Sequence, residues 1–242
     1  MTRLIRTEWL KLATTRGPWA VIAGVIALTA LITPFAMAEI GKGDASRAAD
    51  AQEALAIGPG FITALLLLLL GALASAGEFH HRTIASTYLV TPRRGRVLAA
   101  KLIAHGALGA AVAAIGAAIS FPVVLLMARS DDLHVASTGH LAALAFAIVA
   151  AGALASICGV AAGSILRHQT ASIVVILVWT LLVEKLFGGF FPPVLPFGAI
   201  LAAVGMAGED GPGIAASLAI VAAWAGVLGF AATRVIERDV TA

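Results

Sequence analysis

The sequence predicts an all-α membrane protein that crosses the bilayer six times and forms a single domain over residues 1–242. Charged residues make up 12% of the chain and apolar residues 60%, whereas a soluble domain has about 25% charged residues. The mean hydropathy is +1.00, and a chain of this size cannot hide so much apolar surface from water. This composition excludes a disulfide scaffold, a nucleic-acid-binding domain and a disordered tail.

The spacing of the charges locates the membrane spans. A helix needs about 20 apolar residues to cross a hydrocarbon core of about 30 Å, and one charge at its centre costs about 3 kcal/mol. Stretches without Asp, Glu, Lys or Arg cover residues 17–38, 54–77, 102–128, 133–166, 168–183, 186–208 and 211–233. All of them except 186–208 are interpreted as spans.

The stretch 186–208 is expected not to cross the membrane as a helix. It is interrupted by Gly188, Gly189, Pro192, Pro193 and Pro196. Each proline removes a backbone donor and clashes with the preceding turn. Broken backbone at membrane depth survives only where protein or water satisfies it. We therefore expect a broken, re-entrant segment of short helical pieces before the last span.

The charge-free stretch 168–183 is short for a span. We expect its helix to continue to about Phe187, which makes it long enough to cross. Glu184 and Lys185 then lie at the edge of the membrane, where their side chains are expected to reach the lipid headgroups.

Six spans place both termini on the same side of the membrane. That side then carries Arg3, Arg6, Lys11, Arg16, Arg82, Arg93, Arg94, Arg96, Lys101, Arg167, Arg234 and Arg238. The other side carries Lys42, Arg47, Arg129 and Lys185. Because cytoplasmic segments are rich in Lys and Arg, we expect both termini in the cytoplasm. A seventh crossing is the alternative, but it would place Arg234 and Arg238 outside.

The first span is expected to stay in the protein as an anchor. Ala36, Met37 and Ala38 resemble a signal-peptidase site, so cleavage before Glu39 is the alternative. The apolar region of a signal sequence has about 7–15 residues, which is shorter than the stretch 17–38.

The motifs of several enzyme classes are absent from the sequence. It contains no G-x-x-x-x-G-K-[ST] loop, no H-E-x-x-H and no G-x-S-x-G. The predicted cytoplasmic segments (1–18, 77–101, 165–171 and 233–242) are too short to form a nucleotide-hydrolysing domain. Glu78, His80 and His81 are close in sequence, but no second cluster completes a metal site. We therefore predict neither catalysis nor a metal or cofactor on this chain.

Ion-driven transport normally requires ionisable groups within the bilayer. The interiors of the predicted spans contain only His105 and His140, which are interpreted as headgroup-level or helix-packing residues. The single cysteine, Cys158, is interpreted as a packing residue of the fourth span. Small residues at Gly152, Ser156, Gly159 and Gly163 allow close helix approach there, but they do not identify the partner helix.

The N-terminal residues predict a short basic helix in the headgroup layer. Ile5, Trp9 and Leu12 form an apolar stripe, with Trp9 as an interfacial anchor, and Lys11 lies off this stripe. The alternative is a positive flank that only sets topology.

The segment 77–101 predicts a second short helix on the same side. The Thr83 hydroxyl can accept an amide hydrogen bond at the start of a helix over residues 84–90. Thr91 and Pro92 are then expected to begin the third span. A short helix held tightly between two spans is a plausible lever for an outside protein. The alternative is an ordinary loop whose arginines face membrane charge.

Two motifs in these segments resemble those of permease subunits of ATP-binding-cassette type-2 exporters. They are E-W-L-K-L before the first span and G-E…T…L…P-R-R…A-A-K between the second and third spans. The resemblance covers essentially the whole chain. It departs from the family at Arg82, where a glycine is expected before the threonine.

The resemblance implies which residues couple the chain to a partner. Glu8 and Lys11 would belong to the interfacial helix, and the coupling region would contain Gly77, Glu78, Thr83, Pro92, Arg94 and Lys101. It also implies a second permease copy and a separate ATP-binding subunit that holds ATP and magnesium.

The function expected from the resemblance is ATP-driven export across a bacterial inner membrane. The lack of charge in the predicted spans favours an apolar or amphipathic cargo, such as a lipid, drug or peptide. Three alternatives remain: a secondary transporter driven by an ion gradient, a membrane-embedded enzyme, and an assembly or regulatory subunit without transport.

Overall fold

The computed structural model describes residues 1–40, 56–130, 137–188, 193–206 and 211–238, and every regular element in these ranges is helical. The elements are α1 (Thr2–Thr14), α2 (Arg16–Ile40), the π-helical η1 (Ala56–Ile62), α4 (Thr63–His80), α5 (Ile84–Val90), α6 (Arg94–Ser130), α7 (Thr138–Leu166), α8 (Gln169–Val178), the π-helical η2 (Trp179–Val183), α9 (Glu184–Gly188), α10 (Pro196–Ala203) and α11 (Ile214–Arg238). The predicted outer residues Lys42 and Arg47 lie outside the described residues.

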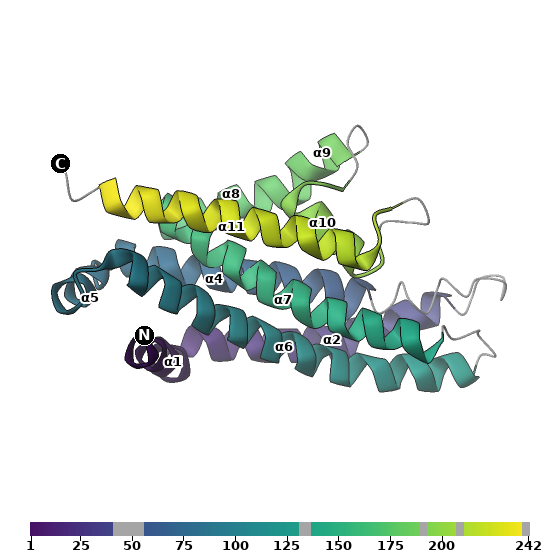
Figure 1. Cartoon of the computed structure of the whole chain (residues 1–242). Helices are drawn as coiled ribbons and strands as arrows, with labels where there is room; N and C mark the ends of the chain where they lie inside the picture. Colours follow the sequence, from purple (N-terminus) through teal and green to yellow (C-terminus); the bar gives the residue numbers. More distant parts are fainter. Residues whose placement is uncertain (41–55, 131–136, 189–192, 207–210, 239–242) are drawn as a thin grey trace.

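Among the described residues, six helical segments are long and apolar enough to cross a membrane, which confirms the predicted number. They are Arg16–Ala38, Pro59–His80, Arg94–Arg129, Thr138–Leu166, Gln169–Phe187 and Ile214–Arg238. The long helices lie side by side in one bundle (Figure 1). The prediction of an all-helical, multi-pass membrane protein is therefore confirmed.

The fifth span and the broken segment after it follow the prediction. The fifth span reaches Phe187, and α10 begins at Pro196, a residue type suited to the first helical position. With 8 residues, α10 is about 12 Å long, less than half of the hydrocarbon core. Gly189 and Pro192, two of the predicted breakers, lie outside the described residues.

Glu184 does not reach the headgroups as expected, because its side chain caps α10. Its carboxylate accepts hydrogen bonds from the backbone amides of Phe197 (3.1 Å) and Gly198 (2.5 Å) and from the indole of Trp179 (2.8 Å). The first amides of a helix lack partners within the helix and form the positive end of its dipole. Glu184 therefore stays buried against the start of α10 and does not extend toward water, whereas Lys185 is exposed.

Small residues let α7 lie against the backbone of its neighbours. A Cβ atom on Gly159 would meet the carbonyl oxygen of Leu68 in α4, and a Cβ atom on Gly152 would meet Ala113 in α6. Helices in lipid associate by this kind of close packing. The predicted small-residue pattern thus identifies α4 and α6 as the partners of α7.

Two short helices, α1 and α5, lie across the bundle at one end, where α11 also ends (Figure 1). We call this the α1–α5 end. The predicted bounds of α5 are confirmed, but α6 begins at Arg94 and not at Pro92. Thr91 is extended (φ −130°, ψ 90°), because a following proline disfavours the helical region.

The buried residues of α1 are Glu8 and Leu12, so Leu12 is the one member of the predicted stripe that is buried in the bundle. Trp9 is exposed on the chain, where the predicted role of interfacial anchor remains a prediction. Lys11 lies off the stripe, as predicted, and pairs with two carboxylates, as described below.

We expect Gly159→Ala to lower the free energy of unfolding by about 2 kcal/mol, because the added methyl group overpacks against the α4 backbone. Gly226→Ala is the matched control, since a Cβ atom on Gly226 meets nothing within 4 Å. Both variants gain the same helix propensity. Unfolding in detergent micelles followed by circular dichroism measures the difference, and equal stability of the two variants would contradict this packing.

Candidate functional site

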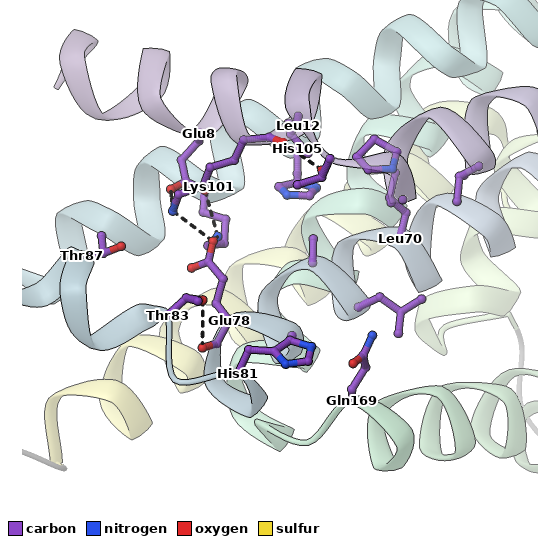
Figure 2. A pocket seen from close by; sticks show the side chains of 18 of the residues that line it. Glu8, Leu12, Leu70, Glu78, His81, Thr83, Thr87, Lys101, His105 and Gln169 are labelled. Carbon is purple, nitrogen blue, oxygen red and sulfur yellow. Dashed lines mark hydrogen bonds and ion pairs between the residues drawn. The ribbon is translucent and has the colours of Figure 1, made fainter.

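Four charged side chains from three helices meet at the α1–α5 end (Figure 2). Glu8 and Lys11 come from adjacent turns of α1, Glu78 from the last turn of α4, and Lys101 from α6. We call these four residues the charge ring. All four are among the residues that the sequence motifs single out.

Positive and negative groups alternate around the ring. Lys101 Nζ donates to Glu8 Oε2 (2.8 Å) and to Glu78 Oε1 (2.7 Å). Lys11 Nζ donates to Glu8 Oε1 (2.7 Å) and to Glu78 Oε1 (3.0 Å). Each charge therefore has two partners of opposite sign, and the four charges cancel.

Burial makes this pairing necessary. The side chain of Lys101 is 4% exposed and that of Glu8 is 5% exposed. Removing one partner of a buried ion pair typically costs about 3–5 kcal/mol, because the remaining charge stays unpaired. The ring therefore fixes α1 relative to α4 and α6.

The pKa values of the two α1 residues show how pairing competes with burial. Burial alone raises the pKa of the Glu8 carboxyl, but the Lys101 and Lys11 ammonium groups outweigh it and bring the pKa below the ordinary 4.5. Burial alone lowers the pKa of Lys11, and the Glu8 and Glu78 carboxylates reverse this and raise it above 10.5. Both groups are thus charged at neutral pH.

A cavity of about 780 Å³ adjoins the charge ring, between α1, α2, α4, α5, α6 and α8. Leu12, Val21, Leu70 and Leu73 line its apolar part. The volume lies within the range of small-molecule sites, about 300–1,000 Å³. Figure 2 shows polar side chains from several helices around the same space.

Six of the eight predicted coupling residues line this cavity: Glu8, Lys11, Gly77, Glu78, Thr83 and Lys101. The other two lie apart from it. Arg94 donates a hydrogen bond to the carbonyl of Ile236 in α11 (3.2 Å) and lies 4.8 Å from the ring centre of Tyr88. Pro92 lies on the surface beside Arg94 and Glu237.

The turn between α4 and α5 contains a residue in the left-handed backbone conformation, which is usually occupied by glycine. Arg82 has φ 58°, in the left-handed region that glycine enters without strain. This is the position where the family resemblance leads us to expect glycine. The Thr83 hydroxyl does not cap α5 as predicted, because it donates to the carbonyl of Glu78 (3.4 Å).

Six polar residues that line the cavity are not among the predicted coupling residues: Thr15, His81, Ser86, Thr87, His105 and Gln169. Among them, His105 is 1% exposed and lines the cavity. One signal was available: His105 follows Lys101 by four residues, so both lie on the same face of a helix.

The surface of α5 is apolar and exposed. No residue of α5 is buried, and Leu89 and Val90 are each 86% exposed. The helix lies beyond the ends of the neighbouring spans (Figure 1). Exposed apolar side chains in such a place are typical of an interaction surface.

Comparisons with known proteins assign no family, since neither a protein-family model nor a curated protein matches the chain.

We expect Glu8→Gln to lower the free energy of unfolding at pH 7 by about 3 kcal/mol, because buried Lys101 loses one of its two carboxylates. The pKa of Glu8 is lowered in the folded protein, so its stabilising effect is present above pH 4.5 and is lost as the pH falls through the folded pKa. The gap between wild type and variant should therefore narrow in acid. Denaturant unfolding in micelles at several pH values measures it.

Arg6→Gln is the control for this variant, because Arg6 is an exposed charge on the same helix and such substitutions change stability by about 0.5 kcal/mol or less. A pH-independent gap, or equal effects of the two substitutions, would contradict the role of the charge ring.

Proposed function

We propose that this chain is the membrane-spanning permease subunit of an ATP-binding-cassette exporter, and that a separate ATP-binding subunit drives it. The observation that carries the proposal is the exposed apolar surface of α5, at Leu89 and Val90. Outside the spans, such side chains favour a soluble partner that covers them.

The charge ring supports the proposal because it joins the α5 region to the spans. The segment that carries α5 connects α4 directly to α6, and the ring ties both of these helices to α1. Pressure on α5 would therefore move α1, α4 and α6 together. Rigid-body motion of packed helices is a common form of switching between two states.

In this proposal the chain performs no chemistry, and ATP and magnesium bind to the partner subunit. A second copy of the chain, or a related permease, completes the translocation path. The α1–α5 end lies in the cytoplasm and the bundle lies in the bacterial inner membrane, in keeping with the Lys and Arg residues at that end. The cargo is an apolar or amphipathic molecule.

We expect an ATP-binding subunit to co-purify with the tagged chain, in mild detergent, from cells that express the whole operon. The double variant Leu89→Glu with Val90→Glu should lower its recovery by roughly tenfold or more, because two carboxylates would be buried without partners in the interface. Quantitative mass spectrometry of the purified complex measures this ratio.

Met206→Glu is the matched control, since Met206 is an exposed apolar residue at the opposite end of the bundle. Wild-type protein recovered without any ATP-binding subunit would argue against the exporter. Solute transport by the chain alone in vesicles, driven by a proton or sodium gradient, would favour the secondary transporter instead.

A further inference from the structure

Two buried polar atoms beside the cavity lack a hydrogen-bond partner among the described residues. They are Glu78 Oε2 and His105 Nδ1, and both residues line the cavity. His105 is 1% exposed. Leaving such an atom unpaired typically costs about 1–3 kcal/mol, and more when the group is charged.

The pairing within the charge ring explains why Glu78 has an unused oxygen. Both lysines donate to Glu78 Oε1, whereas Glu8 uses one oxygen for each lysine. An ionised carboxylate can only accept hydrogen bonds. No described residue donates to Glu78 Oε2, so the donor that satisfies it is a water molecule or a group on a bound ligand.

The charges around this oxygen favour a head group without net charge. The positive charges of the two lysines cancel the negative charges of the two glutamates, so the ring as a whole attracts neither a cation nor an anion. A cation near Glu78 Oε2 would meet the ammonium groups of Lys11 and Lys101, and an anion would meet the carboxylate itself. A hydroxyl or amide N–H donates without either repulsion.

The remainder of the cavity suits a hydrocarbon tail. Leu12, Val21, Leu70 and Leu73 form a wall next to the polar part, and burial of apolar surface there is favourable. Polar and apolar walls thus meet in one cavity of about 780 Å³, which extends from the charge ring along the second span to Leu70.

We propose that this cavity binds an electroneutral amphiphile whose head group donates hydrogen bonds, with the head at Glu78 and His105 and the tail against Val21, Leu70 and Leu73. A hydroxyl-bearing membrane lipid and an alkyl glycoside share this chemistry. The inference does not depend on the proposed ATP-binding partner, because it concerns binding by the chain alone.

The test uses the full chain in phosphatidylcholine nanodiscs, since the phosphatidylcholine head group has no hydrogen-bond donor. A dodecyl glucoside with a photoreactive diazirine in its tail is the probe, and mass spectrometry locates the crosslinks. We expect crosslinks at Val21, Leu70 and Leu73 that unlabelled dodecyl glucoside displaces.

Competitors with the same tail separate head-group recognition from tail binding. Dodecyl glucoside should displace the probe at a roughly tenfold lower concentration than dodecyltrimethylammonium or dodecyl sulfate, which lack a donor. Dioleoylglycerol, which carries one hydroxyl, tests a membrane lipid as the source. If it competes as well as the glucoside, a lipid can occupy the site; if only the glucoside competes, a soluble amphiphile is the fitting ligand.

Two variants and one control variant complete the test. His105→Phe removes both ring nitrogens at similar size and should narrow the tenfold preference for donor head groups. Leu73→Trp should abolish labelling by filling the apolar part, whereas Leu182→Trp, at an exposed position of the fifth span, should not. Crosslinks spread evenly over exposed apolar residues, or equal displacement by all head groups in the unmodified chain, would overturn the proposal.

Discussion

The architecture at the α1–α5 end depends on a simple electrostatic constraint: the oppositely charged Glu8 and Lys101 are buried and must stay paired, and the partly exposed Lys11 and Glu78 complete the pairing. The charge ring satisfies this constraint only while α1, α4 and α6 keep one arrangement, because each ion draws its partners from more than one helix. Loss of a single partner leaves a buried charge, which costs several kcal/mol. A helix of 13 residues, marginal on its own in water, is thereby fixed at the end of the bundle.

A second constraint, close backbone packing, extends this fixed unit through the membrane. Glycines of α7 leave no space for a side chain against α4 and α6, so the helices that carry the ring are also held together along their length. The first, fifth and sixth spans bury a smaller share of their residues within the chain. The molecule thus combines a tightly packed group of α1, α4, α6 and α7 with spans that leave more of their surface exposed on this chain.

The six spans could be predicted from the sequence because a charge in lipid is costly, so spans appear as charge-free stretches. The broken segment and the bounds of α5 could be predicted because prolines and a threonine mark where helices end and begin. The pairing within the ring could not, since Glu8 and Lys101 are separated by 93 residues and helical periodicity assumes that charges face water. The same assumption placed Glu184 at the headgroups. Motif resemblance named all four ring residues, but it gave no reason for their charges, and His105 lay outside every motif.

Glu78 belongs to both proposed functions, and this has a thermodynamic consequence. Its Oε1 holds the two lysines that tie α1 and α6 to the end of α4, and its Oε2 faces the cavity without a partner. A ligand that donates to Oε2 changes the charge available to both lysines, so the free energy of the ring differs between the occupied and the empty cavity. If a soluble partner displaces α5, the helices α4 and α6 on either side of it move, and the distances within the ring change as well. Linkage then requires that each event alters the other by the same free energy, which would let the partner sense an occupied cavity without any direct contact with the amphiphile.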